Sequence, residues 1–543
     1  MPERLAWLLI VIRLLSLFLA IWTSLLATGA PRPNIVYLMA DDLGYGDVKC
    51  FGGERCKIAT PHFDRLAREG MRFTDAHPVA SVCVPSRMAI MTGRYPWRFV
   101  PPRPSGPWGY LNPRLRKDQF TLGRMMRKAG YRTSYVGKWH LGTLMVTTDG
   151  KNQMETNVDF TVPMKIGPRD YGFDESFVLP GSLDMYPYVF ARNNRWVGKV
   201  TKTRGWSAFN RVGPCAEDFE DWKVLDTFSS EAEKFIAGRA AEAKEGNPFF
   251  LYVALTSPHT PTSPHPKFQG KSAIGPYGDF VMEADDCLGR VLNALKEHGV
   301  AGNTLVIATS DHGPAPYAGP KLKATYGQIH EMEKEGHWPG GIYRGYKFSV
   351  YEGGLRVPFV VRWPGVVKEG ATCERLIGLN DLMATLAEVT GTKLAGGQAP
   401  DSVSYLPLLK NAEGGATRES MLMQSTHNFV VRKGAWKLAL CPGSGCRAIW
   451  GNLPKPEEAW KKALGAFGGN QPKDADLGKA PFVQLFNLAS DPREKASLAA
   501  KHPEIVAELL EIARDAVARG RTTPGPDLPN DRKGIRYLPR VPK

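Results

Sequence analysis

The segment with the most distinctive chemistry begins at Cys83. It reads Cys-Val-Pro-Ser-Arg over 83–87 and continues through Met-Ala-Ile-Met to Thr-Gly-Arg at 92–94. A cysteine just before Pro-Ser is typical of a helix start, where we expect an exposed thiol near the positive end of the helix dipole. On this fragment alone, Cys83 could be an ordinary thiol nucleophile or a buried cysteine.

Two pairs of potential metal ligands each directly follow a short apolar run. The pairs are Asp41-Asp42 and Asp311-His312. Two carboxylates held together repel each other unless a cation joins them. The first pair therefore indicates one half of a metal site, and the second pair indicates the other half. A helix cap or a solvated turn is the alternative interpretation of Asp41-Asp42.

Four basic side chains lie in short blocks rich in glycine, proline and aromatic residues. Lys138 and His140 belong to Gly-Lys-Trp-His-Leu-Gly, and His259 follows Ser-Pro. Lys347 precedes Tyr-Glu-Gly-Gly by four residues. A lysine and a histidine two residues apart on a loop can face one pocket. A surface lysine and a packing histidine would give the same pattern, so these fragments alone do not identify a site.

Apolar periodicity predicts the elements that must position these residues. Continuous apolar runs suit strands buried on both faces of a parallel sheet, and they occupy 35–39, 249–255 and 305–308. A further strand is predicted at 131–136. Helical patterns alternate with them at 63–69, 120–128 and 281–298. This alternation predicts an open α/β sheet. In such sheets ligands bind beyond the carboxyl ends of the strands, which is where the acidic and histidine pairs lie.

The pattern changes after Leu409. Short strand-like segments predict a small antiparallel sheet; they are 421–424, 429–432, 436–440 and 484–488. A helix is predicted near the end of the chain, at 503–519. We therefore expect a large domain over 31–409 and a smaller one over 410–543. Long loops that select the ligand are predicted where glycine, proline and aromatic residues accumulate, at 96–113, 142–211 and 313–346.

The first 30 residues have the pattern of a secretion signal. Arg4 and Arg13 precede the apolar run 14–27, and Thr-Gly-Ala at 28–30 supplies small residues for cleavage. The apolar run is short for the ~20 residues needed to span a bilayer. We predict a signal peptide over 1–30 and a secreted or periplasmic protein. If Arg13 is tolerated at the interface, 5–27 would instead be an uncleaved membrane anchor.

The chain of 543 residues carries a formal charge of +16, from 70 basic and 54 acidic residues. This charge could attract polyanions. No long Lys/Arg run with interleaved aromatics occurs, however, so we expect no nucleic-acid partner. Eight cysteines are too few for a disulfide scaffold of this length. Cys50 and Cys56 could pair across a short loop, as could Cys441 and Cys446.

The cysteine segment as a whole resembles the signature of the sulfatase family, which is Cys-x-Pro-Ser-Arg with Thr-Gly five residues on. The blocks around Lys138, His259 and Lys347 are also similar to blocks of this family. The resemblance covers most of the mature chain, and the inserted loops and the tail from Thr522 match least.

This family is formylglycine-dependent, arylsulfatase-like and part of the alkaline-phosphatase-like superfamily. The resemblance therefore implies a particular α/β fold. A large mixed, mostly parallel sheet would be sandwiched by helices in a catalytic domain over 31–409. A smaller C-terminal α+β domain with an antiparallel sheet would follow.

In that family the cysteine is oxidised to formylglycine, so Cys83 is expected to need a formylglycine-generating enzyme as a partner. The resemblance also implies one divalent metal ion, with the ligands Asp41, Asp42, residue 83, Asp311 and His312. Calcium is the expected ion because it prefers oxygen ligands. Many sulfatases have asparagine where this chain has His312, although a histidine variant is also found. Since imidazole is a poorer calcium ligand, magnesium or a softer ion stays open.

The resemblance places four further residues around the sulfate. Lys138, His259 and Lys347 would hold its oxygens. Arg87 would support residue 83, whose hydrated aldehyde offers two hydroxyl groups.

The proton transfers also follow from the resemblance. One hydroxyl group, activated by Asp311 and the metal, would attack sulfur, while His259 or Lys347 protonates the leaving alcohol. His140 would then draw a proton from the second hydroxyl, which expels sulfate and restores the aldehyde. The chain is therefore predicted to be a sulfuric ester hydrolase.

Two other functions fit parts of the pattern. A phosphodiesterase or phosphonate-ester hydrolase of the same superfamily can use the same modified residue, and a non-catalytic binder of sulfated glycans would leave Cys83 a thiol. The substrate stays open between a sulfated carbohydrate and an aryl sulfate. Aromatic residues of the predicted loops could stack on either or simply hold the loops together: Trp97, Trp108, Tyr110, Trp196, Trp206, Tyr317, Tyr326 and Trp338.

Overall fold

A computed structural model describes most of the chain, in the ranges 32–99, 106–205, 209–321, 327–415, 417–425, 428–441, 443–445 and 483–531. The predicted signal peptide over 1–30 lies outside these ranges, and so do Trp206, Tyr326 and Cys446. Within the described ranges, no helix has the length and apolar character needed to cross a bilayer.

The core of the molecule is a sheet of ten strands in the order β13-β2-β12-β11-β1-β10-β4-β5-β6-β7. Its five central strands are parallel: β11 (Thr304–Ser310), β1 (Asn34–Asp41), β10 (Phe249–Pro258), β4 (Arg132–Lys138) and β5 (Glu175–Leu179). Every residue of β1, β10 and β11 is buried. The continuous apolar runs thus correctly predicted strands covered on both faces.

Shorter strands extend this sheet at both edges. On one side are β12 (Phe359–Arg362), β2 (Met71–Phe73) and β13 (Ala371–Cys373); on the other are β6 (Phe190–Arg192) and β7 (Arg195–Val197). The pairings β11–β12, β12–β2, β5–β6 and β6–β7 are antiparallel. The sheet is therefore mixed but mostly parallel, as predicted.

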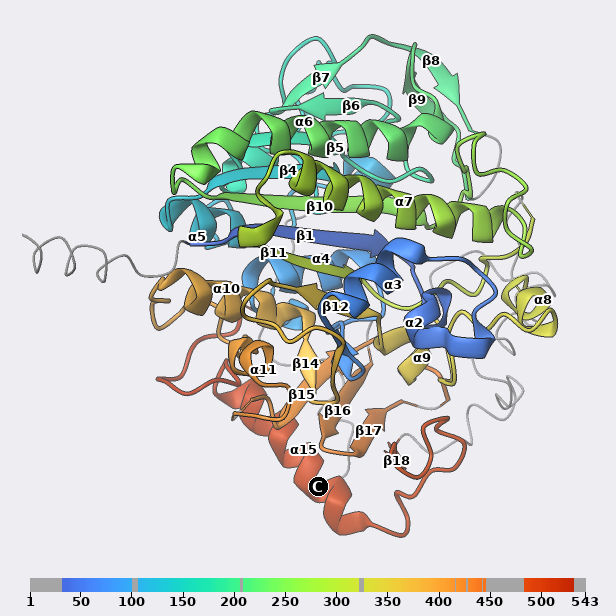
Figure 1. Ribbon diagram of the computed structural model, residues 1–543, viewed down its shortest axis with the longest axis vertical. Helices are drawn as coiled ribbons and strands as arrows, with labels where there is room; N and C mark the ends of the chain where they lie inside the picture. Colours follow the sequence, from blue (N-terminus) through green and yellow to red (C-terminus); the bar gives the residue numbers. More distant parts are fainter. Residues whose placement is uncertain are drawn as a thin grey trace, which may run out of the picture.

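Helices cover both faces of the sheet. On one face, α3 (Pro61–Arg68), α6 (Val224–Lys244) and α7 (Pro276–Glu297) pack together, with α6 and α7 against β10 (Figure 1). The other face carries α4 (Cys83–Thr92), α5 (Leu122–Lys128) and α10 (Leu382–Thr390). The sequence predicted α3, α5 and α7 but not α6. Shorter elements complete this part: α2 (Lys49–Gly52), α8 (Ile329–Lys334), α9 (Glu352–Leu355), α11 (Leu406–Lys410), β3 (Ala76–His77) and β14 (Ile377–Gly378).

The prediction of a structureless loop over 142–211 is wrong. The segment contains β5, β6 and β7, and also β8 (Val200–Arg204), which pairs with β9 (Gly213–Ala216). Three residues in the middle of β8 are exposed, so the strand has no apolar alternation that the sequence could show. The β8–β9 hairpin lies on the side of the molecule toward which the arrowhead of β1 points (Figure 1).

A small antiparallel sheet follows in the chain, as predicted. It contains β15 (Ser420–Gln424), β16 (Phe429–Lys433), β17 (Trp436–Leu440) and β18 (Val483–Asn487) in that order. The helix α15 (Pro503–Ala518) packs against β16. One apolar cluster contains side chains of this sheet together with Val79, Trp97 and Val350, so the small sheet packs against segments that precede it in the chain.

Cys50 and Cys56 do not form the bridge that the sequence allowed. Both are free thiols. The Cys56 thiol instead donates hydrogen bonds to the carbonyl oxygens of Asp47 and Ile58, at 3.3 and 3.4 Å. The suggested partner of Cys441, Cys446, lies outside the described residues.

Candidate active site

The ends of the two central strands β1 and β11 bring the acidic pairs together. Asp41 is the last residue of β1, and Asp42 has a positive φ of 63°. Aspartate tolerates this left-handed conformation better than most residues, and it turns the chain out of the strand. The backbone N–H of Asp42 donates to Asp311 Oδ1 at 3.2 Å. Because both acids follow parallel strands at the same edge of the sheet, the sequence correctly predicted that they would be neighbours.

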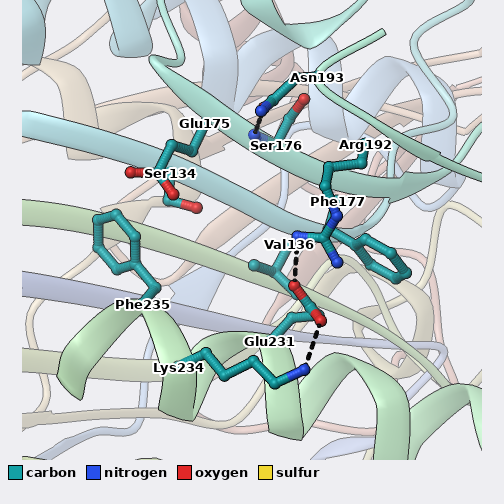
Figure 2. Close-up of a pocket in the computed structure, with 10 residues that line it drawn as sticks. All are labelled: Ser134, Val136, Glu175, Ser176, Phe177, Arg192, Asn193, Glu231, Lys234 and Phe235. Atoms are coloured by element: carbon teal, nitrogen blue, oxygen red, sulfur yellow. Dashed lines mark hydrogen bonds and ion pairs between the residues drawn. The ribbon is translucent and has the colours of Figure 1, made fainter. Parts of the chain in front are cut away.

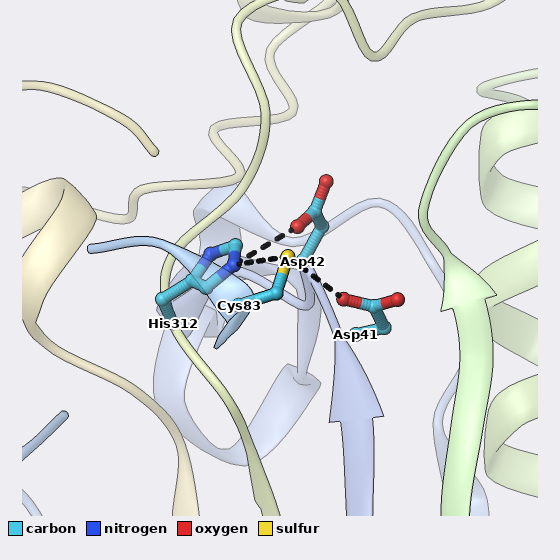
Figure 3. A group of neighbouring side chains, drawn as sticks. All are labelled: Asp41, Asp42, Cys83 and His312. Atoms are coloured by element: carbon cyan, nitrogen blue, oxygen red, sulfur yellow. Dashed lines mark hydrogen bonds and ion pairs between the residues drawn. The ribbon is translucent and has the colours of Figure 1, made fainter. Parts of the chain in front are cut away.

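Cys83 is the first residue of α4 and lies between these acids. Its Sγ is 3.2 Å from His312 Nε2 and 3.7 Å from Asp41 Oδ1 (Figure 3). The expectation of an exposed thiol is wrong, because only 3% of the residue is exposed. The start of α4 packs under the strand ends, and burial raises the pKa of the Cys83 thiol to about 12. The thiol is therefore protonated at neutral pH in this geometry.

The donor atoms of four residues, Asp41, Asp42, Cys83 and His312, all lie within 4.8 Å of one another. His312 Nδ1 is 2.9 Å from the carbonyl oxygen of Gly313. Because a carbonyl only accepts, this bond puts a proton on Nδ1, and Nε2, 3.3 Å from Asp42 Oδ1, is the ring nitrogen that faces the acids. This is how proteins orient a metal-ligating histidine.

Asp311 lies beside this group of four. Its Oδ1 is 3.6 Å from His312 Nε2. Arg87 holds the other oxygen, with its Nε and Nη2 both 3.0 Å from Asp311 Oδ2. Arg87 Nη2 is also 3.5 Å from Asp41 Oδ1, so this buried guanidinium connects the two strand ends.

Two buried lysines complete the charge balance. Lys138 Nζ bonds Asp41, and Lys347 Nζ lies 2.7 and 3.0 Å from the two oxygens of Asp42. Burial alone would lower the pKa of each lysine, but the carboxylates raise both above the ordinary value. Burial alone would raise the pKa of Asp41, yet Lys138 and its other cationic neighbours hold it well below its usual range.

Three carboxylates (Asp41, Asp42, Asp311) and three cations (Arg87, Lys138, Lys347) therefore neutralise one another in this buried centre. A divalent cation would add two positive charges. Such a surplus of positive charge, buried away from water, suits the binding of an anionic ester group.

The two predicted histidines border the same centre. His140 has a positive φ of 51°, and its buried Nδ1 has no hydrogen-bond partner among the described residues. His259 follows β10; its Nε2 is 3.8 Å from Asp42 Oδ2, and its Nδ1 bonds the carbonyl of Thr260. Burial, together with nearby Lys138, lowers the pKa of both rings well below the ordinary value. Both are therefore neutral imidazoles.

The structure thus brings all ten predicted site residues to one edge of the sheet. Sequence reasoning missed Asp184, a neighbour of His259, and Arg211, which pairs with Asp184. Asp184 lies five residues after β5 ends at Leu179. Its place beyond the carboxyl end of a central strand was the signal that could have identified it.

A second charged cluster lies where the small sheet meets the large one. Donor atoms of Asp75, His77 and Glu352 lie within 4.8 Å of one another. The cluster already contains its own cations, because Arg356 contacts both Asp75 and Glu352, at 2.6 and 2.7 Å, and Lys437 contacts Glu352 at 2.9 Å. These cations would repel a metal ion. Glu352 therefore belongs to an internal ion-pair network.

We expect Glu352→Gln to lower the free energy of unfolding by about 3 kcal/mol, because it leaves part of the charge of Lys437 and Arg356 buried and uncompensated. Denaturant titration measures this loss. The exposed pair Lys433–Glu508 provides the control, since Glu508→Gln should change stability by less than about 1 kcal/mol. A catalytic role for Glu352 would instead lower turnover at unchanged stability.

One cavity of about 330 Å³ is lined by residues of β4, β5 and α6, and none of the predicted site residues lines it (Figure 2). Most of its charged side chains pair with one another. Arg192 is 2.6 Å and Lys234 is 3.2 Å from Glu231. Glu175, the remaining charged side chain of the cavity, pairs with Arg239 outside it, so each charged group here already has a partner.

The α/β fold and a buried centre of paired acids, lysines and neutral histidines at its strand ends define a hydrolase for anionic esters. The comparisons with known proteins make this specific. The family model named Sulfatase matches residues 33–392, and the chain belongs to the sulfatase family. It is a sulfuric ester hydrolase.

Several relatives are similar over nearly the whole chain. The N-acetylgalactosamine-6-O-sulfatase of Bacteroides thetaiotaomicron is 32% identical over 90% of this chain and 94% of its own. The steryl-sulfatase of Mus musculus is 30% identical over 92% of this chain and 84% of its own. A solved structure described under metabolism of multiple glycosaminoglycans by Bacteroides thetaiotaomicron superimposes with a TM-score of 0.73 at 30% identity, covering 90% of this chain and 99% of the other.

Proposed function

We propose that this sulfatase hydrolyses a sulfate ester of a carbohydrate, using formylglycine made from Cys83 and a divalent metal ion. The observation that carries the proposal is the position of Cys83. Its Sγ, the atom that the modification would replace with oxygen, lies between His312 Nε2 and Asp41 Oδ1. Relatives named for N-acetylgalactosamine 6-sulfate support a sugar substrate, and N-acetylgalactosamine 6-sulfate is the first compound to test.

The donor set fits a metal ion. Asp41 and Asp42 offer hard carboxylate oxygens, and His312 offers its Nε2, with the ring held by the Nδ1 bond to Gly313. Oxidation of Cys83 would exchange a soft sulfur for oxygen, which favours calcium. The imidazole of His312 is a poorer calcium ligand than an oxygen, so magnesium is the second ion to test. When bound, the ion would polarise a sulfate oxygen and offset its charge.

The buried side chains would then share the work on the ester. Lys138 and Lys347 would hold the sulfate oxygens as charged ammonium groups, and Arg87 would keep Asp311 and Asp41 in place. The neutral ring of His140 has a free nitrogen that can accept a proton.

The leaving alcohol needs a proton of its own. Lys347 carries a proton beside Asp42 and would supply it. His259 is neutral, and its Nδ1 proton bonds the Thr260 carbonyl, so it would first have to take up a second proton. Maturation would require a formylglycine-generating enzyme, and the apolar run 14–27 supports export of the chain to the periplasm or beyond.

The test compares three substrates at equal concentration, with enzyme produced together with a formylglycine-generating enzyme: N-acetylgalactosamine 6-sulfate, an aryl sulfate and an aryl phosphate diester. We expect release of inorganic sulfate from the sugar, measured by ion chromatography, and slower turnover of the diester. A diester cleaved faster than both sulfates would favour the phosphodiesterase alternative. Binding of the sulfated sugar without release of sulfate would favour a non-catalytic binder.

A further inference from the structure

A buried carboxylate with one unused oxygen lies directly beside His259. Asp184 is only 4% exposed. Its Oδ2 accepts a hydrogen bond from Arg211 Nη1 at 2.7 Å, and the same nitrogen donates to the Asp184 carbonyl oxygen at 2.8 Å. Its Oδ1 has no hydrogen-bond partner among the described residues. A buried carboxylate oxygen without a donor is unfavourable, so it marks a place where a ligand can supply one.

The ring of His259 lies between this oxygen and Asp42. The Nε2 edge of the ring faces Asp42 at 3.8 Å, whereas the Nδ1 edge is 3.9 Å from Asp184 Oδ1. Nδ1 already donates to the carbonyl of Thr260, so it does not satisfy Asp184. In the proposed function the leaving sugar lies beside His259, so it also lies close to Asp184.

Arg211 and Trp108 continue this surface. The Arg211 guanidinium lies 3.5 Å from the centroid of the Trp108 ring. Trp108 is 38% exposed, and its loop is tied to the neighbouring one by the Gly109 N–H, which donates to the Tyr186 carbonyl at 3.0 Å. Because Arg211 neutralises Asp184, the pair does not repel an anionic substrate. A carboxylate, a guanidinium and an aromatic ring held in fixed positions form a typical polar specificity surface.

We infer that Asp184, held by Arg211, is a specificity-determining residue that accepts a hydrogen bond from a hydroxyl group of the sugar carrying the sulfate, an inference that rests on the proposed function. The substrate class it selects is a sulfated sugar with a free ring hydroxyl close to the ester. Aryl and steryl sulfates have no such hydroxyl and leave Asp184 Oδ1 without a donor.

The experiment measures kcat/KM of Asp184→Ala and Asp184→Asn on N-acetylgalactosamine 6-sulfate and on para-nitrophenyl sulfate. A hydrogen bond to a charged group predicts a loss of about 10- to 100-fold on the sugar for Asp184→Ala. The aryl sulfate should change by less than about threefold, because it never makes the bond. Asp184→Asn keeps an acceptor oxygen and should lose less on the sugar than Asp184→Ala does. If Asp184→Ala does not fold, the same comparison is made with Asp184→Asn alone.

Asp221→Asn is the matched control. Asp221 is equally buried, pairs one oxygen with Arg204, and also has an oxygen without a partner among the described residues. Its variant should leave the ratio of the two activities unchanged.

Four outcomes would overturn the inference. An equal loss on both substrates would mean that Asp184 acts through His259 or through the fold, and unchanged activity on both would mean that it has no role. Wild-type enzyme that cleaves the aryl sulfate but not the sugar would refute the substrate class while leaving a sulfatase. Wild-type enzyme that cleaves neither would refute the proposed function itself.

Discussion

Replacing Cys83 with serine is expected to lower steady-state turnover of sulfate esters by about 10³-fold or more, the scale seen when a covalent nucleophile is removed. The expected defect is specific. A serine has one hydroxyl group, which can take up sulfate and release the alcohol once. It has no second hydroxyl from which His140 could draw a proton to expel the sulfate.

Rapid-mixing measurements with an aryl sulfate distinguish this defect from simple inactivation. The variant should release about one equivalent of phenol per active site and then stop, as expected for a trapped covalent intermediate, with little free sulfate. Cys287→Ser is the matched control, because Cys287 is a free thiol with the same 3% exposure as Cys83 but lies in α7. It should keep full turnover.

Mass spectrometry checks the premise in the wild-type protein. The peptide that carries residue 83 should be lighter than the unmodified thiol by about 18 Da, the change from thiol to aldehyde that creates the nucleophile. An unmodified peptide in active enzyme, or full turnover by Cys83→Ser, would contradict the formylglycine mechanism.

Asp42→Asn is the second change with a large expected effect, because it should remove both the metal ion and the activity. Asp42 supplies one of the two carboxylates within the group of four donors. It is also the partner of Lys347, whose ammonium group lies 2.7 Å away. Loss of this charge weakens the metal site and leaves a buried ammonium poorly compensated. We expect kcat/KM to fall by about 10³-fold or more.

Metal content and stability give readouts besides activity. Calcium at about 100 times its dissociation constant should stabilise chelator-treated wild-type protein by about 2.7 kcal/mol, whereas Asp42→Asn should show no calcium-dependent shift in Tm. Asp285→Asn is the control: this buried carboxylate in α7 accepts from the backbone of His62 and Phe63. Its loss should reduce stability but not metal content. Stoichiometric metal in Asp42→Asn would contradict the assignment.

The sequence by itself predicted the central strands and the place of the site, and the physical reason is local. A strand buried on both faces must be apolar throughout, so β1, β10 and β11 are visible as continuous apolar runs. Parallel strands end at the same edge of the sheet, so polar residues that directly follow such runs become neighbours. Asp41, Asp42, Asp311 and His312 were found in this way.

Resemblance to a family added what local physics could not supply. The alternative interpretations of Cys83 and of the fragment around Lys138 were open from the residues alone. Their roles depended on the motif as a whole, from Cys83 to the Thr-Gly at 92–93.

The tertiary structure decided the contacts between segments far apart in the chain. Lys347 meets Asp42 across 305 sequence positions, and Arg87 meets Asp311 across 224; no local pattern specifies which lysine or arginine pairs with which acid. The burial of Cys83 follows from packing of α4 under the strand ends, which a helix-start motif does not reveal.

The parts that sequence reasoning missed have weak local signals. The helix α6 buries small residues such as Ala232 and Ala240 among its larger ones, so its apolar period is faint, and β5 to β9 are short or half-exposed. Asp184 and Arg211 lie in this same region, 27 positions apart. The sequence thus predicted a sulfatase and the residues of its candidate site. Only the tertiary structure placed the carboxylate of Asp184 beside His259, because that contact depends on how distant segments pack.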